Sequence, residues 1–162
     1  MEHITVERSI WIDAPRERVW QAVTEPEQMA KWFLPALPWA QMRRDANEML
    51  SVIMGEMSTK FAVFENIESP RHITSRSLPD KLIATTYTLD EERSGTRLSV
   101  MMSGFEALPA DARHDRLAMS SAAWEQTLEN LKAHIAGAEL PFPQAAVGAL
   151  FGFWREGKEW IA

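Results

Sequence analysis

The most reactive side chains of the central region lie on one predicted strand. His72, Thr74 and Arg76 alternate along that strand, so they form a polar row on one of its faces. If this row faced a cavity, it could bind an anionic or carbonyl group. Ile73 marks the opposite face as the buried one, and we therefore expect the row to face solvent.

Tyr87 is the only tyrosine of the chain and lies on the next predicted strand. It shares a face with Ile83, Thr85 and Leu89, which predicts a buried side chain. A buried phenol needs a hydrogen-bond partner. In a pocket it could orient a ligand or act as a weak acid; otherwise it is a core aromatic that bonds to water or backbone.

Recognised catalytic patterns are absent from the sequence. It contains no phosphate-binding glycine loop, no H-E-x-x-H and no G-x-S-x-G motif. The absence of cysteine excludes disulfides and thiolate chemistry, and the four histidines lack metal-ligand spacing. Glu25 with Glu27, and Glu91 with Glu92, are expected to be capping or turn charges. We assign no catalytic residue, metal or cofactor, and binding is favoured over catalysis.

Bulky apolar side chains supply the candidates for a ligand site. Methionine adapts to varied apolar contacts, although methionine and aromatic residues also fill ordinary cores. Trp39 follows two prolines in a loop, where it could close a pocket or pack beneath the loop. The candidate ligand-binding residues are Trp32, Phe33, Trp39, Met54, Phe61, Tyr87 and Trp124.

The elements that would position these residues begin with a strand. Residues 3–12 alternate as a half-buried strand does, and Pro15 and Pro26 each begin a short helical pattern within residues 13–33. Thr24 and Glu27 have the spacing of a capping box for the second helix. A bent pair of helices could close one end of a sheet with Trp20 and aromatic residues of the second helix.

The remainder of the chain changes from strands to one long helix. Residues 34–47 are expected to form a loop, which could enter a strand. Five strands are predicted at 48–54, 58–67, 71–78, 81–90 and 95–104, with the spacing of an antiparallel meander. A helical stripe then runs through Leu117, Ser121, Trp124, Leu128, Leu131 and Ile135, and Gly137 ends it.

This order of elements, and several motifs within it, resemble a known family. The motifs are "DAPRERVW", "TEPEQMAKWF", "ENIESPRHIT", "YTLDEERSGTRLSV", "SGFEALP" and "AAWEQTLENLKAHI", spread over residues 3–136. Together they resemble the START-like, or SRPBCC, superfamily, in the branch named after the homologue of the heat-shock-protein-90 ATPase activator. Two departures stand out: Ala123–Trp124 replaces the usual Gly-Trp, and the usual Gly-Gly turn is missing.

The resemblance implies an α+β helix-grip fold. In this fold a curved antiparallel sheet wraps around one long C-terminal helix, and two short helices follow the first strand. We expect this domain to span residues 1–137. Residues 138–162 would form an apolar extension, without charge over 140–154, that packs on the domain or on a partner subunit as a homodimer contact. A lipid-facing anchor is a further alternative.

Three functions are consistent with that fold. The first is binding of a small apolar or amphipathic molecule in a cavity between the sheet and the long helix. The second is an enzyme of the cyclase or aromatase type, which the wider superfamily includes and which would depend on Tyr87, His72 or Arg76. The third is a chaperone co-factor, as the branch name suggests.

Charge and composition narrow the partners and the location. The net charge is −6 and no long basic run occurs, so nucleic acid and anionic membranes are not expected partners. The N-terminus does not have the pattern of a signal peptide, and no apolar run is long enough to span a membrane. We therefore expect a cytoplasmic protein.

Overall fold

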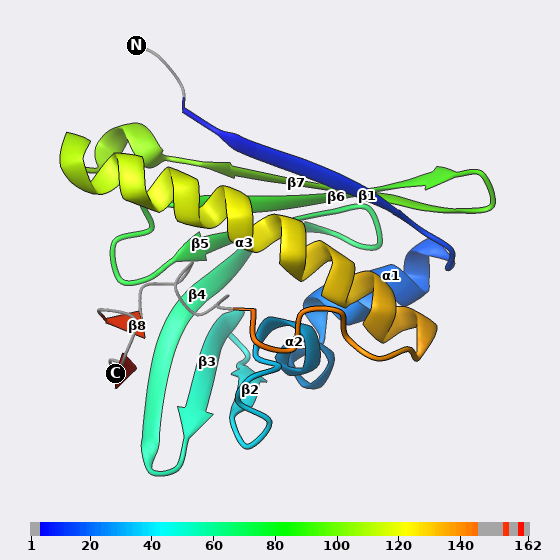
Figure 1. The fold of residues 1–162 in the computed structure, drawn as a ribbon, viewed down its shortest axis with the longest axis horizontal. Coiled ribbons are helices and arrows are strands. Elements are labelled where there is room, and N and C mark those ends of the chain that lie inside the picture. The colour runs from blue at the N-terminus through cyan, green and yellow to red at the C-terminus, as the bar shows by residue number, and fades with distance from the viewer. Residues whose placement is uncertain (1–3, 146–153, 156–158, 161–162) are drawn as a thin grey trace.

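The computed structural model describes residues 4–145 in full and the backbone of 154–155 and 159–160. A seven-stranded sheet curves around the long helix α3, which lies across its concave face (Figure 1). The elements are β1 (Val6–Ile12), α1 (Arg16–Thr24), α2 (Pro26–Phe33), β2 (Gln41–Arg44), β3 (Met49–Met54), β4 (Met57–Glu68), β5 (His72–Ser77), β6 (Ala84–Glu92), β7 (Gly95–Ser103), the 3-10 helix η1 (Phe105–Ala107), α3 (Ala110–Ala136), β8 (Trp154–Arg155) and β9 (Glu159–Trp160). The predicted α+β helix-grip fold is confirmed.

The sheet has the strand order β1-β7-β6-β5-β4-β3-β2, and every neighbouring pair is antiparallel. The first strand therefore pairs with the last, while β2 forms the other edge. The sequence predicted five strands after the short helices, and the seven-stranded sheet contains six there, because the segment around Met42 adds β2 to the meander. The separate pair β8–β9 is antiparallel as well.

The two short helices are separated by a single extended residue, Glu25, which sets the bend between them. The indole N–H of Trp32 donates to the carbonyl of Ala22 at 2.8 Å and ties α2 back onto α1 across this bend. The predicted capping box is wrong. Glu25 occupies the N-cap position without a side-chain bond, and the hydroxyl of Thr24 donates to the carbonyl of Trp20 within α1 instead.

The long helix buries one face against the sheet, but polar residues contribute more to that face than the sequence predicted. Trp124, Leu128 and Leu131 are buried as expected, and Gly137 ends the helix in the left-handed region, with φ of 72°. The fully buried set also includes three polar residues that the predicted stripe omitted: Ser120, Thr127 and Asn130. Ser121, which the predicted stripe included, is only half-buried and accepts a hydrogen bond from Arg8, which extends from β1.

The chain returns along α3 after Gly137. The amide side chain of Asn130 makes two hydrogen bonds to the backbone of Phe142, one from its Nδ2 to the carbonyl (2.8 Å) and one to its Oδ1 from the N–H (2.9 Å). Ala145 is buried. The rest of the predicted extension lies outside the described residues apart from the backbone of β8 and β9, so its dimer role stays a prediction.

The connection from β7 to η1 contains a close backbone approach. Gly104 has φ of 99°, and a Cβ atom placed there would lie 1.9 Å from the carbonyl oxygen of Leu82. Only glycine fits this position. Within the part of the chain that the structure describes, no helix combines the length and the apolar character required to cross a membrane.

Candidate functional site

Six of the seven predicted ligand-binding residues lie in one hydrophobic core beneath the sheet. None of the six is more than 8% exposed: Trp32, Phe33, Met54, Phe61, Tyr87 and Trp124. Trp39 is the exception, since this residue is 60% exposed in the loop between α2 and β2. It does not pack beneath that loop, which removes one of the two roles considered for it.

Ring contacts connect the aromatic members of this core. Phe33 stacks on Trp32 with ring centroids 4.0 Å apart. The rings of Phe33 and Trp124 form an edge-to-face contact with centroids 6.0 Å apart. Trp124 in turn contacts Tyr87 at 6.1 Å, edge to face. The indole N–H of Trp124 points to the sulfur of Met102 at 2.9 Å. These contacts join α2, α3 and the strands β6 and β7 in one aromatic wall.

Tyr87 is buried in this wall, and burial raises the pKa of its phenol far above the ordinary value. The phenol therefore stays neutral at physiological pH. A neutral phenol can donate or accept a hydrogen bond, but it is a poor general acid or base. Tyr87 is therefore suited to orienting a polar group rather than to transferring a proton.

The polar row of β5 lies on the sheet face away from α3. Ile73 pairs with Tyr87 on the inner face, so Thr74 and Arg76 project from the outer one. Thr74 is itself buried and bonds to the hydroxyl of Thr86 at 3.1 Å. Arg76 forms an ion pair with Glu65 at 2.8 Å. Neither side chain is directed at the aromatic wall.

Two buried hydroxyls on α3 are the polar groups that sequence reasoning missed. Ser120 and Thr127 are fully buried, and neither hydroxyl has a hydrogen-bond partner. They lie one turn before and one turn after Trp124, so all three share the helix face that points at the sheet. Ser75 and Thr85, which pair across β5 and β6, are on the inner sheet face and are also buried. In the sequence, only the seven-residue spacing of Ser120 and Thr127 on either side of Trp124 indicates that they share its buried face.

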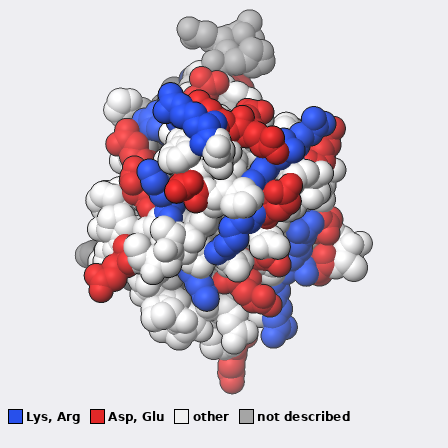
Figure 2. Space-filling model, turned by 90° about the vertical axis from the view of Figure 1, so that its right-hand side faces the viewer, with Lys and Arg blue, Asp and Glu red and all other residues white. Residues whose placement is uncertain are grey.

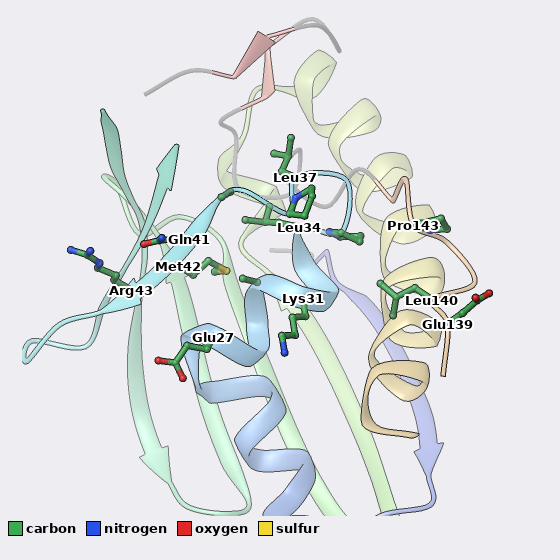
Figure 3. Close-up of a pocket in the computed structure, with 14 residues that line it drawn as sticks. Glu27, Lys31, Leu34, Leu37, Gln41, Met42, Arg43, Glu139, Leu140 and Pro143 are labelled. Atoms are coloured by element: carbon green, nitrogen blue, oxygen red, sulfur yellow. The ribbon is translucent and has the colours of Figure 1, made fainter. Parts of the chain in front are cut away.

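A separate groove lies on the outside of α2 (Figure 3). Its volume is about 970 Å³, and it is bounded by α2, the following loop, β2 and the segment that follows α3. The lining is mostly apolar, with charged side chains at the margin: Glu27, Ala30, Lys31, Leu34, Pro35, Leu37, Pro38, Ala40, Gln41, Met42, Arg43, Glu139, Leu140 and Pro143. Because these residues come from segments about 100 positions apart, no pattern in the sequence indicates the groove.

Charged side chains of both signs are interspersed over the end of the molecule that carries α1 and the end of α3 (Figure 2). Among the residues that the structure describes, no three histidine, aspartate or glutamate side chains gather closely enough to hold a metal ion.

A curved antiparallel sheet around a long C-terminal helix, with two short helices after the first strand, defines a START-like (SRPBCC) protein. The family model described as "Activator of Hsp90 ATPase homolog 1-like protein" matches residues 13–136. The chain belongs to this family. No curated protein matches the sequence.

Solved structures with the same fold have low sequence identity to this chain. Protein MLL2253 from Mesorhizobium loti is 19% identical with a TM-score of 0.63, over 85% of this chain and 100% of the other. The Aha1 dimer from Colwellia psychrerythraea is 14% identical with a TM-score of 0.62, over 82% and 96%. DynU16, a protein in the dynemicin biosynthetic locus, is 19% identical with a TM-score of 0.60, over 82% and 47%. At such identities the likeness concerns the fold alone.

Proposed function

We propose that this protein binds a small, mostly apolar molecule between the sheet and α3. The observation that carries the proposal is the pair of unpartnered hydroxyls on α3, Ser120 and Thr127. Leaving a buried hydroxyl without a partner costs about 1–3 kcal/mol, and native structures rarely retain such groups. A ligand with a hydrogen-bonding group would satisfy them when it binds.

The surroundings of these hydroxyls suit an apolar ligand. Aromatic rings and the adaptable side chains of Met54 and Met102 lie in the same core, and binding sites for small molecules are typically apolar with a few placed polar groups. In the proposed site Trp124 and Tyr87 would contact the body of the ligand. The occurrence of this fold in a protein of a biosynthetic locus is compatible with such a ligand, as an analogy of fold only.

Binding is better supported than catalysis. Of the three residues on which a cyclase-type reaction would depend, His72 and Arg76 belong to the outward row and Tyr87 is held neutral by burial. The chaperone alternative rests on the family description and on no contact within this chain.

Native mass spectrometry of the purified protein tests the proposal first, followed by extraction of any bound molecule. The second step is titration of ligand-free protein with Nile red, a neutral apolar probe. We expect saturable binding that Ser120→Ala and Thr127→Val weaken for a ligand that hydrogen-bonds to them. Thr88→Val, on the outer sheet face, should leave binding unchanged.

The absence of both a co-purified mass and saturable binding would contradict the proposal. If Ser120→Ala and Thr127→Val change binding no more than Thr88→Val does, the proposed location of the ligand is wrong.

A further inference from the structure

Two cationic side chains and a histidine lie where α1, α2 and the end of α3 meet, and together they are called the cationic cluster below. Arg18 comes from α1, Lys31 from α2 and His134 from the last turn of α3. The side-chain oxygen of Gln28 accepts hydrogen bonds from the guanidinium of Arg18 at 3.3 Å and from Nε2 of His134 at 2.7 Å. Because an amide oxygen only accepts, Nε2 carries the imidazole proton.

The two cations of this cluster form no ion pair among the residues that the structure describes. Neither Arg18 nor Lys31 forms an ion pair with another described residue, whereas six other ion pairs are present. Burial, then Arg18, then Lys31 lower the pKa of His134, and no carboxylate offsets them. Arg18 and Lys31 are therefore free of a direct ion-pair partner within the described residues, which leaves them available to an external anion.

Lys31 belongs both to this cluster and to the groove over α2. Along the groove the next side chains are apolar: Leu34 and Met42 are buried on its floor, and Leu140 and Pro143 form the opposite side (Figure 3). A cationic end next to an apolar channel is complementary to a molecule that carries an anion at one end. The volume, about 970 Å³, lies within the range of small-molecule sites.

Two acidic residues also line the groove, and their positions affect the argument differently. In Figure 3 the side chain of Glu139 is directed away from the apolar floor. Glu27 is one helical turn before Lys31 and forms no ion pair with it. Glu27 must therefore weaken the attraction for an anion, and its removal should strengthen it.

We propose that the groove over α2 is a second ligand site, which takes an aliphatic carboxylate. The hydrocarbon chain lies against Leu34, Met42 and Leu140, and the carboxylate is held by Lys31 with Arg18 and His134 nearby. This site is separate from the interior between the sheet and α3, and the proposal does not depend on the function proposed above.

The test compares dodecanoate with dodecan-1-ol by calorimetry, below the concentration at which dodecanoate forms micelles. We expect dodecanoate to bind more tightly than the alcohol. Lys31→Gln and Arg18→Gln should each weaken dodecanoate binding about two- to fivefold, the range of one exposed charge pair, and Glu27→Gln should strengthen it. Lys60→Gln, which makes the same charge change on β4, is the matched control.

Chemical-shift mapping locates the bound probe and separates the two sites. Shifts at Lys31, Met42 and Leu140 support the groove. Shifts confined to Thr127 and Trp124, with no effect of Lys31→Gln, would overturn this proposal while leaving the interior site intact. The proposal also fails if dodecanoate does not bind saturably, or if Lys31→Gln and Lys60→Gln have equal effects.

Discussion

Replacing Thr127 with valine should make the ligand-free protein more stable. The side chain is fully buried in α3 and its hydroxyl has no hydrogen-bond partner. Valine has nearly the same shape and a similar helix propensity, so the main change is the loss of an unsatisfied polar group. The penalty for burying such a group is about 1–3 kcal/mol, and removing it should raise the free energy of unfolding by about 1 kcal/mol or more.

The assay is denaturant unfolding of protein that has been refolded from denaturant to remove any bound molecule. For a chain of this size, a gain of about 1 kcal/mol corresponds to a rise in Tm of about 2–4 °C. Thr96→Val is the matched control, because Thr96 is equally buried and its hydroxyl donates to the carbonyl of Ala14 at 2.8 Å. That variant leaves the carbonyl unpaired and should lose about 1–3 kcal/mol.

The two variants should therefore change stability in opposite directions. A Thr127→Val protein that is less stable than the parent, by an amount like that of Thr96→Val, would mean that the hydroxyl has a partner in the ligand-free protein. No unsatisfied hydroxyl of Thr127 would then remain for an interior ligand to satisfy.

Three further predictions concern other parts of the domain. Burial raises the pKa of Tyr87, so the contribution of this residue to stability is complete below the ordinary phenol pKa of about 10 and is lost as pH rises beyond it. In an alkaline titration, phenolate absorbance should therefore appear only together with unfolding. The pKa of His134 is lowered, so its contribution to stability is complete above about pH 6.5 and declines as pH falls. Gln28→Glu should raise that pKa and reduce the loss of stability in acid. NMR titration of His134 and unfolding at pH 5 and 7.5 measure the two effects. Gly104→Ala should cost several-fold more stability than Gly55→Ala, because both glycines have positive φ but only the first would bring a Cβ against backbone; equal losses would refute the steric argument.

The sequence predicted most elements because their apolar residues repeat with a clear period. Trp124, Leu128 and Leu131 fall at helical spacing, and the structure buries all three against the sheet. For the edge strand around Met42 the sequence predicts only a loop that could enter a strand, since four residues after several prolines show too little alternation to define one.

The spacing of apolar residues predicted only part of the candidate site. Large apolar side chains identify a core, and six of the seven selected residues are in it. Ser120 and Thr127 were missed because a hydroxyl at a helical position usually indicates solvent rather than the interior. The cationic cluster could not be predicted from the sequence. Arg18 and His134 are far apart along the chain, and only the tertiary structure brings both to Gln28.

The two hydrogen bonds between the side chain of Asn130 and the backbone of Phe142 affect how the sequence after α3 can vary. Both hydrogen bonds go to the main chain of Phe142, and the residue as a whole is 37% exposed. Any residue except proline could present the same N–H and C=O, so the path of the returning chain is encoded in the helix rather than in the segment that follows it. Homologous chains could therefore exchange the side chains around position 142 freely while keeping the same route, provided that the helix retains its amide.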